Sequence, residues 1–142
     1  MYSKIIVTLD GSAYAERALP HGEALAKGLS VKLVLLEVVP YPAVQDQSVE
    51  GDWAKEDRDY MSGLSEGLKS RGVDTEVEVL WGPVAQKIVE YADADEQALL
   101  VMSTHGRTGL ARLAFGSITE AVLRDVKTTP ILVCRCLSPD SK

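Results

Sequence analysis

The sequence is poor in residues that cross-link a chain or anchor it in a membrane. Its 142 residues include two cysteines, Cys134 and Cys136. Residues two apart in a strand point to the same side, so we expect no bridge between them. Metal binding by the thiols would need further ligands, and the sequence has no cluster of Cys and His. No apolar run approaches the roughly 18 residues of a membrane helix, and no secretion-signal pattern is present. We therefore expect a reduced, cytoplasmic protein.

Positive charge is also scarce, and the formal net charge is −6 at pH 7. Nucleic acids and anionic membranes are bound by basic surfaces, so we expect neither as a partner. The hydrophobic fraction is 46% and the charged fraction is 25%, as in an ordinary globular protein. Length and composition together predict one domain over residues 1–142.

Several motifs of nucleotide-dependent and hydrolytic enzymes are missing. There is no G-x-x-x-x-G-K-[ST], which excludes a P-loop, and no G-x-G-x-x-G after the first strand, which excludes the dinucleotide fingerprint. Neither His21 nor His105 has a G-x-S-x-G serine as a partner. An enzyme stays an alternative hypothesis, but it would need a catalytic residue that the sequence does not display.

Short apolar runs alternate with amphipathic stretches, which predicts an α/β protein. The predicted strands are Ile5–Leu9, Val31–Val39, Val73–Leu80, Ala98–Met102 and Pro130–Cys134. Helices are predicted from Ala15 to Leu29 after an N-cap at Ser12, across Trp53 to Leu68, from Pro83, and from a capping box of Ser117 and Glu120. The stretch from Tyr41 to Val49 is expected to be a surface loop.

This order of elements predicts one doubly wound, mostly parallel sheet of five strands with helices on both faces. Two strand orders, 3-2-1-4-5 and 2-1-3-4-5, are compatible with right-handed crossovers. In either order a ligand binds at the carboxyl ends of the strands, where the chain switches direction. Val73–Leu80 alternates apolar and acidic residues, which is typical of an edge strand with one wet face.

Chemistry-bearing residues gather after the first and fourth predicted strands. After the fourth, Gly106 and Gly116-Ser117 flank a loop and open a helix, which suits a polyphosphate cradle or an ordinary capped turn. After the first, Asp10 can contact ribose or Mg²⁺, or can simply interact with the helix N-terminus. His105 can donate to a phosphate or merely pack, His21 is expected to be structural, and Glu37 can face either way.

These segments resemble the universal stress proteins over essentially the whole chain. The family's ATP motif is G-x-x-G, nine residues, then G-[ST]. Gly106, nine intervening residues and Gly116-Ser117 fit it, whereas Ser103 stands where the motif has its first glycine. The opening Asp10-Gly-Ser and the closing Thr129-Pro-Ile-Leu-Val133 also match. The resemblance implies strand order 3-2-1-4-5, an adenine nucleotide alpha hydrolase-like fold, and a nucleotide lying across strands 1 and 4.

Site residues follow from the resemblance by matching position. The residues implied to surround the base, ribose and phosphates are Thr8, Leu9, Asp10, Val38, Met102, Ser103, His105, Gly106, Gly116, Ser117, Ile118 and Thr119. ATP is the implied ligand, with Asp10 a candidate contact for its Mg²⁺. The family also implies a stress-related, nucleotide-responsive role without catalytic residues, and a homodimer through Pro130 to Cys136. The alternative is a homodimeric stress protein that binds partners and no nucleotide, which Ser103 favours.

Overall fold

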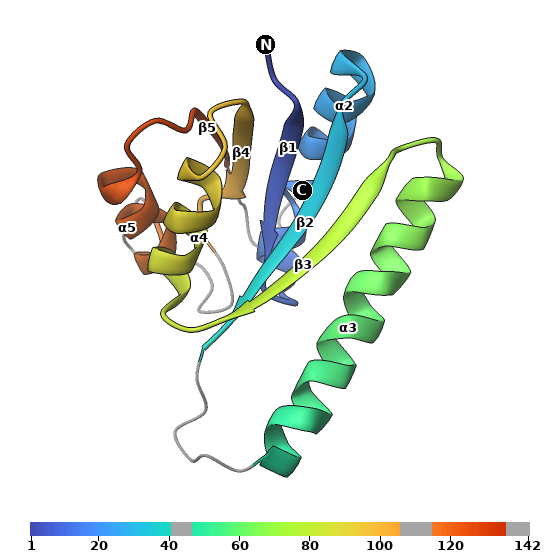
Figure 1. Ribbon diagram of the computed structural model, residues 1–142, viewed down its shortest axis with the longest axis vertical. Helices are drawn as coiled ribbons and strands as arrows, with labels where there is room; N and C mark the ends of the chain where they lie inside the picture. Colours follow the sequence, from blue (N-terminus) through green and yellow to red (C-terminus); the bar gives the residue numbers. More distant parts are fainter. Residues whose placement is uncertain (41–46, 106–114, 136–142) are drawn as a thin grey trace.

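The computed structural model describes residues 1–40, 47–105 and 115–135. Five parallel strands form one sheet in the order β3-β2-β1-β4-β5 (Figure 1). The strands are β1 (Lys4–Leu9), β2 (Lys32–Val39), β3 (Thr75–Trp81), β4 (Ala98–Ser103) and β5 (Ile131–Cys134). The predicted fold class is confirmed, and of the two possible strand orders the protein has 3-2-1-4-5. Val73–Leu80 corresponds to β3, which is an edge strand as predicted.

Helices cover both faces of the sheet (Figure 1). One face carries α1 (Ala13–Glu16), α2 (Leu19–Leu29) and α3 (Gln47–Ser70), and the other carries α4 (Val84–Asp93) and α5 (Ser117–Asp125). Two apolar cores result. Leu33 and Leu35 of β2 pack with Met61 of α3 on the first face, while Leu36 of β2 packs with Ile88 of α4 on the second. Alternate residues of the central strands therefore serve opposite cores, and this explains their continuous apolar runs.

The prediction of a single first helix is wrong, because the chain forms two. Ser12 caps α1 as predicted, and its Oγ accepts from the Ala15 N–H at 3.1 Å. A second helix, α2, begins at Leu19 with Pro20 in its first turn. Proline has no N–H and its ring clashes with the carbonyl of the residue four positions earlier, so a helix running through Glu16 to Pro20 is interrupted.

Two other predicted boundaries are corrected. The capping box at Ser117 and Glu120 is wrong, because the N-cap of α5 is Gly116 and no side chain caps this helix. The Gly116 carbonyl already accepts from the Glu120 N–H at 2.9 Å, so the first turn starts one residue earlier. The predicted loop 41–49 is wrong at its end, where α3 begins at Gln47; residues 41–46 lie outside the described part of the chain.

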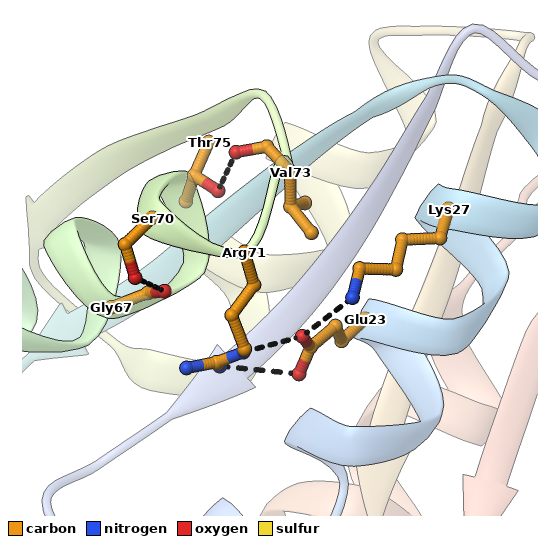
Figure 2. Close-up of polar contacts among 7 residues, drawn as sticks. All are labelled: Glu23, Lys27, Gly67, Ser70, Arg71, Val73 and Thr75. Atoms are coloured by element: carbon orange, nitrogen blue, oxygen red, sulfur yellow. Dashed lines mark hydrogen bonds and ion pairs between the residues drawn. The ribbon is translucent and has the colours of Figure 1, made fainter.

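Close packing at one glycine sets how near α2 lies to the sheet. A Cβ on Gly22 would stand 2.3 Å from Cγ2 of Val7, so only glycine fits without a shift of the helix. Glu23, the next residue of α2, accepts from Arg71 Nε at 2.7 Å and pairs with Lys27 at 3.4 Å (Figure 2). The hydrogen bond from Arg71 is the main cause of a lowered pKa of the Glu23 carboxyl. This group of charges joins α2 to the turn that follows α3.

Searched over the described segments, the helices include none that is both long enough and apolar enough to cross a membrane. Cys134 is buried as a free thiol at the end of β5, and burial raises its pKa. Cys136 lies outside the described residues.

Candidate functional site

A cavity of about 280 Å³ opens at the carboxyl ends of β1 and β4, where the strand order reverses. This is the place where open parallel sheets bind their ligands. Six elements contribute to its wall: β1, α1, β2, α4, β4 and α5, together with the loop segments next to them. The lining residues are Thr8, Leu9, Asp10, Ala15, Leu36, Glu37, Val38, Val39, Pro40, Val84, Ile88, Met102, Ser103, His105, Gly116, Ser117, Ile118 and Thr119.

Eleven of the twelve residues predicted for the site line this one cavity. The twelfth, Gly106, lies outside the described residues. The structure thus brings together two segments that are about a hundred positions apart in the chain, since parallel strands end at the same edge of a sheet.

The β1 side of the cavity is a tight turn built on a glycine. Gly11 has φ of +85°, a conformation that residues with a Cβ rarely adopt. Asp10 precedes it, and its Oδ1 accepts from the Ser12 N–H at 2.9 Å. Asp10 therefore bonds to the N-cap residue of α1, in agreement with its predicted interaction with the helix N-terminus, and it also lines the cavity.

On the β4 side, Ser103 and His105 line the cavity and are 5% and 6% exposed, and Thr104 between them is 8% exposed. Ser103 donates its hydroxyl to the His105 carbonyl, and Thr104 Oγ1 lies 3.0 Å from His105 Nδ1. The segment is therefore held by its own side chains before any ligand is present.

Ser103 fits this backbone without strain. Of the non-glycine residues in the described ranges, only Ser30 has a positive φ, so position 103 does not require the conformation that favours glycine. A glycine at this position would leave out the hydroxyl that bonds to His105. The departure from the family motif thus adds a hydrogen bond to the turn.

The N-terminus of α5 forms the third side of the cavity. Gly116 and the first three helical residues line it, and the first N–H groups of a helix have no acceptor within that helix. Gly116 donates its own N–H to the Thr104 carbonyl at 2.7 Å. Thr119 donates its hydroxyl to the Ser103 carbonyl at 2.9 Å. These two bonds fasten the helix end to the end of β4.

The rest of the wall is apolar on the α4 face of the sheet. Leu36 of β2, Val84 and Ile88 of α4, and Met102 of β4 line it. Leu36, Val84 and Ile88 were not among the residues predicted for the site. The apolar stripe of the predicted helix after Pro83 is the signal that would have found two of them.

Acidic groups gather close to the cavity on the opposite face of the sheet. The sequence left open whether Glu37 is buried or turned outward. It is buried, at 2% exposed, and lines the cavity. Tyr60 of α3 donates its hydroxyl to Glu16. Its pKa is raised by burial, by this bond and by the nearby charges of Glu16, Glu37 and Asp10. In the described part of the chain, no group of three or more His, Cys, Asp or Glu is arranged to hold a metal ion.

Known proteins share this fold and are similar in sequence over nearly the whole chain. Residues 1–135 match the model of the universal stress protein family. Universal stress protein MJ0531 of Methanocaldococcus jannaschii is 30% identical over 142 residues, which cover 95% of this chain and 83% of that protein. The solved structure of MJ0577 from the same organism has a TM-score of 0.87 at 25% identity, covering 97% of this chain and 99% of that one.

A third relative was solved with a ligand. It is the universal stress protein from Archaeoglobus fulgidus in complex with dAMP, with a TM-score of 0.69 and 21% identity over 93% of this chain and 97% of that one. At this identity the likeness concerns the fold. The match to the family model spans nearly the full length of the sequence, and the chain belongs to the universal stress protein family.

Proposed function

We propose that the chain is a single-domain, nucleotide-responsive module of the stress response, which binds an adenine nucleotide, ATP with Mg²⁺, in the cavity between β1 and β4. The observation that carries this proposal is the composition of one cavity. An apolar slot lies beside the N-terminus of a helix, at the edge of the sheet where ligands of such folds bind.

The apolar part of the cavity suits a nucleobase. Leu36, Val84, Ile88 and Met102 offer side chains without hydrogen-bonding groups, which pack against the faces of a planar ring. The base then needs its edge recognised by backbone groups, and Val38 at the end of β2 is the proposed source. The bound nucleotide of the Archaeoglobus relative, dAMP, supports an adenine base.

The polar part of the cavity suits phosphate. The first N–H groups of α5 have no acceptor within the helix, and together with the positive end of the helix dipole they attract anions. Ser117 and His105 add side chains that can donate to phosphate oxygens, and Gly106 is proposed to complete this cradle. Asp10 is the proposed contact for Mg²⁺. One or two carboxylates suffice when the phosphates hold the metal and water fills its other positions.

In the described part of the cavity wall, the hydroxyl groups beside His105 are already engaged. The Ser103 hydroxyl donates to the His105 carbonyl, and the Thr104 hydroxyl contacts the His105 ring. We propose that any hydrolysis of ATP is slow and incidental, and that occupancy of the cavity is what matters to the cell. Steady-state turnover above about one per second would contradict this, because it lies within the usual range of enzymes.

Calorimetry with ATP and Mg²⁺ tests the proposal, with GTP and Mg²⁺ as the matched competitor. We expect binding of ATP and at least a tenfold weaker response to GTP, since the slot is proposed to recognise an adenine edge. Protein purified without added nucleotide is also denatured, and any small molecule that it releases is identified. Failure to detect ATP binding at millimolar concentration would refute the proposal.

The exposed edge of β5 favours the predicted homodimer through Pro130 to Cys136, although residue 136 lies outside the described part of the chain. Leu132 is 39% exposed on this edge strand, and edge strands readily pair with another chain. We propose that a second copy pairs there in the cytoplasm, and that nucleic acid and membranes are not partners. Light scattering of the Leu132→Asp variant should then report a monomer where the parent protein reports a dimer.

A further inference from the structure

The buried segment Ser103-Thr104-His105 at the end of β4 is bonded to two further elements, β5 and α5. The Thr104 N–H donates to the Cys134 carbonyl at 2.9 Å, and the Thr104 carbonyl accepts from the Gly116 N–H at 2.7 Å. Cys134 is the last residue of β5, and Gly116 caps α5. The two peptide groups that flank Thr104 therefore connect the edge strand β5 to α5, the helix that borders the cavity.

This segment also forms part of the cavity wall. Ser103 and His105 line the cavity, whereas Thr104 between them is buried behind it. The contact of 3.0 Å between Thr104 Oγ1 and His105 Nδ1 ties the lining imidazole to the residue that holds β5. A ligand that fixes His105 thus also restricts Thr104.

The strand that Thr104 holds is the shortest one in the described sheet. β5 has four residues and pairs with β4 from Leu100–Ile131 to Ser103–Cys134. Short edge strands have few contacts and open at low cost relative to the whole protein (β5 and its neighbours are labelled in Figure 1). A small gain in order at Thr104 therefore has a measurable effect on β5.

We propose that ligand binding in the cavity and closure of the edge strand β5 are coupled through Thr104. This proposal rests on the proposed function, because it needs a nucleotide that contacts the β4 side of the cavity. Coupling between two equilibria is reciprocal. A second copy paired on β5 would then raise nucleotide affinity by the same factor by which nucleotide favours pairing. Nucleotide binding between β1 and β4 would in this way stabilise β5, which lies on the other side of β4.

Cys134 provides a built-in reporter of this coupling. It is 6% exposed at the end of β5, and the protein has one other cysteine, which Cys136→Ser removes. The rate at which a thiol-specific disulfide reagent labels Cys134 then measures how often β5 opens. We expect saturating ATP and Mg²⁺ to slow labelling at least about fivefold, the lower end of typical allosteric coupling.

Hydrogen exchange separates coupling from general stabilisation. The two edges of the sheet, β5 and β3, serve as test and control. We expect ATP to protect the amides of Leu132 and Val133, with little change at Val77 and Val79. Equal protection of both edges, or none at β5 despite binding by calorimetry, would overturn the coupling and leave the proposed function standing. Absence of binding would overturn both.

Two threonine variants locate the connection. Thr104→Val keeps the shape and the backbone bonds but removes the hydroxyl that contacts His105. We expect this variant to bind ATP. We also expect that ATP then slows the labelling of Cys134 by less than about twofold. Thr128→Val is the matched control, because it removes a hydroxyl contact with Asp93 near the other end of β5. The control should keep the full effect. Circular dichroism verifies that both variants fold, and full coupling in Thr104→Val would contradict the role of this residue.

Discussion

Both ends of the sheet carry polar residues, but the two ends use them differently. At the amino end the side chains bind one another: Lys32 Nζ lies 2.7 Å from Glu76 Oε1, and Lys4 lies between Asp95 at 3.5 Å and the ring of Tyr91 at 4.9 Å. At the carboxyl end Ser103 and His105 are buried and line a cavity. The first group closes its end of the sheet, while the second leaves room for another molecule.

At the amino end of the sheet, both carboxylate oxygens of Asp93 accept hydrogen bonds. Its carboxylate accepts from the backbone N–H groups of Lys127, Thr128 and Thr129 at 2.9 to 3.2 Å and from the Thr129 hydroxyl at 2.7 Å. Burial acts to raise the pKa of Asp93, but these hydrogen bonds outweigh it and lower the pKa from 3.8 to about 2. A strongly perturbed carboxylate can thus be structural, and the cavity is the better indicator of function.

The largest effect expected at the carboxyl end is on binding. Gly116 has φ of −68°, which valine tolerates, but it lines the cavity at the cap of α5. We expect Gly116→Val to weaken ATP binding at least 100-fold, about 2.7 kcal/mol, by filling space needed by the ligand. Calorimetry measures this, and Gly63→Val on the open surface of α3 is the control. Unchanged affinity would place the ligand elsewhere.

The largest effect expected at the amino end is on stability. Asp93→Ala removes a charged acceptor from three consecutive residues that lead into β5. Hydrogen bonds to charged groups contribute more than neutral ones, and we expect a loss of about 2 kcal/mol in the free energy of unfolding in urea. Affinity for ATP should change less than about twofold. A variant that lost binding but not stability would reverse the assignment of the two ends.

Lowering the pH should remove the stabilisation that Asp93 provides at the amino end of the sheet. The folded pKa of Asp93, about 2, lies below the ordinary 3.8, so its stabilisation is present above the ordinary value and is lost as the pH falls toward 2. We expect this carboxyl to contribute at most about 2 kcal/mol to the fall in unfolding free energy between pH 5 and pH 2. Asp93→Asn should flatten the curve over that range. An unchanged slope would contradict the lowered pKa.

The smallest effect is expected for the exposed ion pair of Lys32 and Glu76. The hydrogen bond from Lys32 lowers the pKa of Glu76, yet both groups are solvated and screened. Glu76→Gln should leave the melting temperature unchanged within error at physiological salt. A clear drop would show that the amino end depends on this pair as well as on Asp93.

Periodicity was enough to predict the sheet and its helices, because strands buried on both faces have continuous apolar runs. It failed where one residue redirects the chain. Pro20 divides the first helix, and Gly116 takes over the cap that the pattern assigned to Ser117. Both are local backbone effects that an apolar pattern does not record.

The candidate site was predictable where the family motif names residues and was incomplete elsewhere. The motif led to Ser103 and Gly116, and the match at Asp10-Gly-Ser led to Asp10; the parallel topology brings all three to one edge. It did not indicate Thr104, because a role based on backbone bonds to Cys134 and Gly116 depends on tertiary contacts. The burial of Glu37 likewise depends on which helix covers its strand.

An NMR titration with ATP and Mg²⁺ tests the account most directly, because it reports both ends of the sheet at once. We expect the amide signals of Ser103, His105, Ser117 and Thr119 to shift with saturation, while those of Lys4, Lys32 and Lys127 stay in place. Signals that do not move at millimolar ATP, or that move at the amino end instead, would contradict the claim that the cavity between β1 and β4 binds the nucleotide.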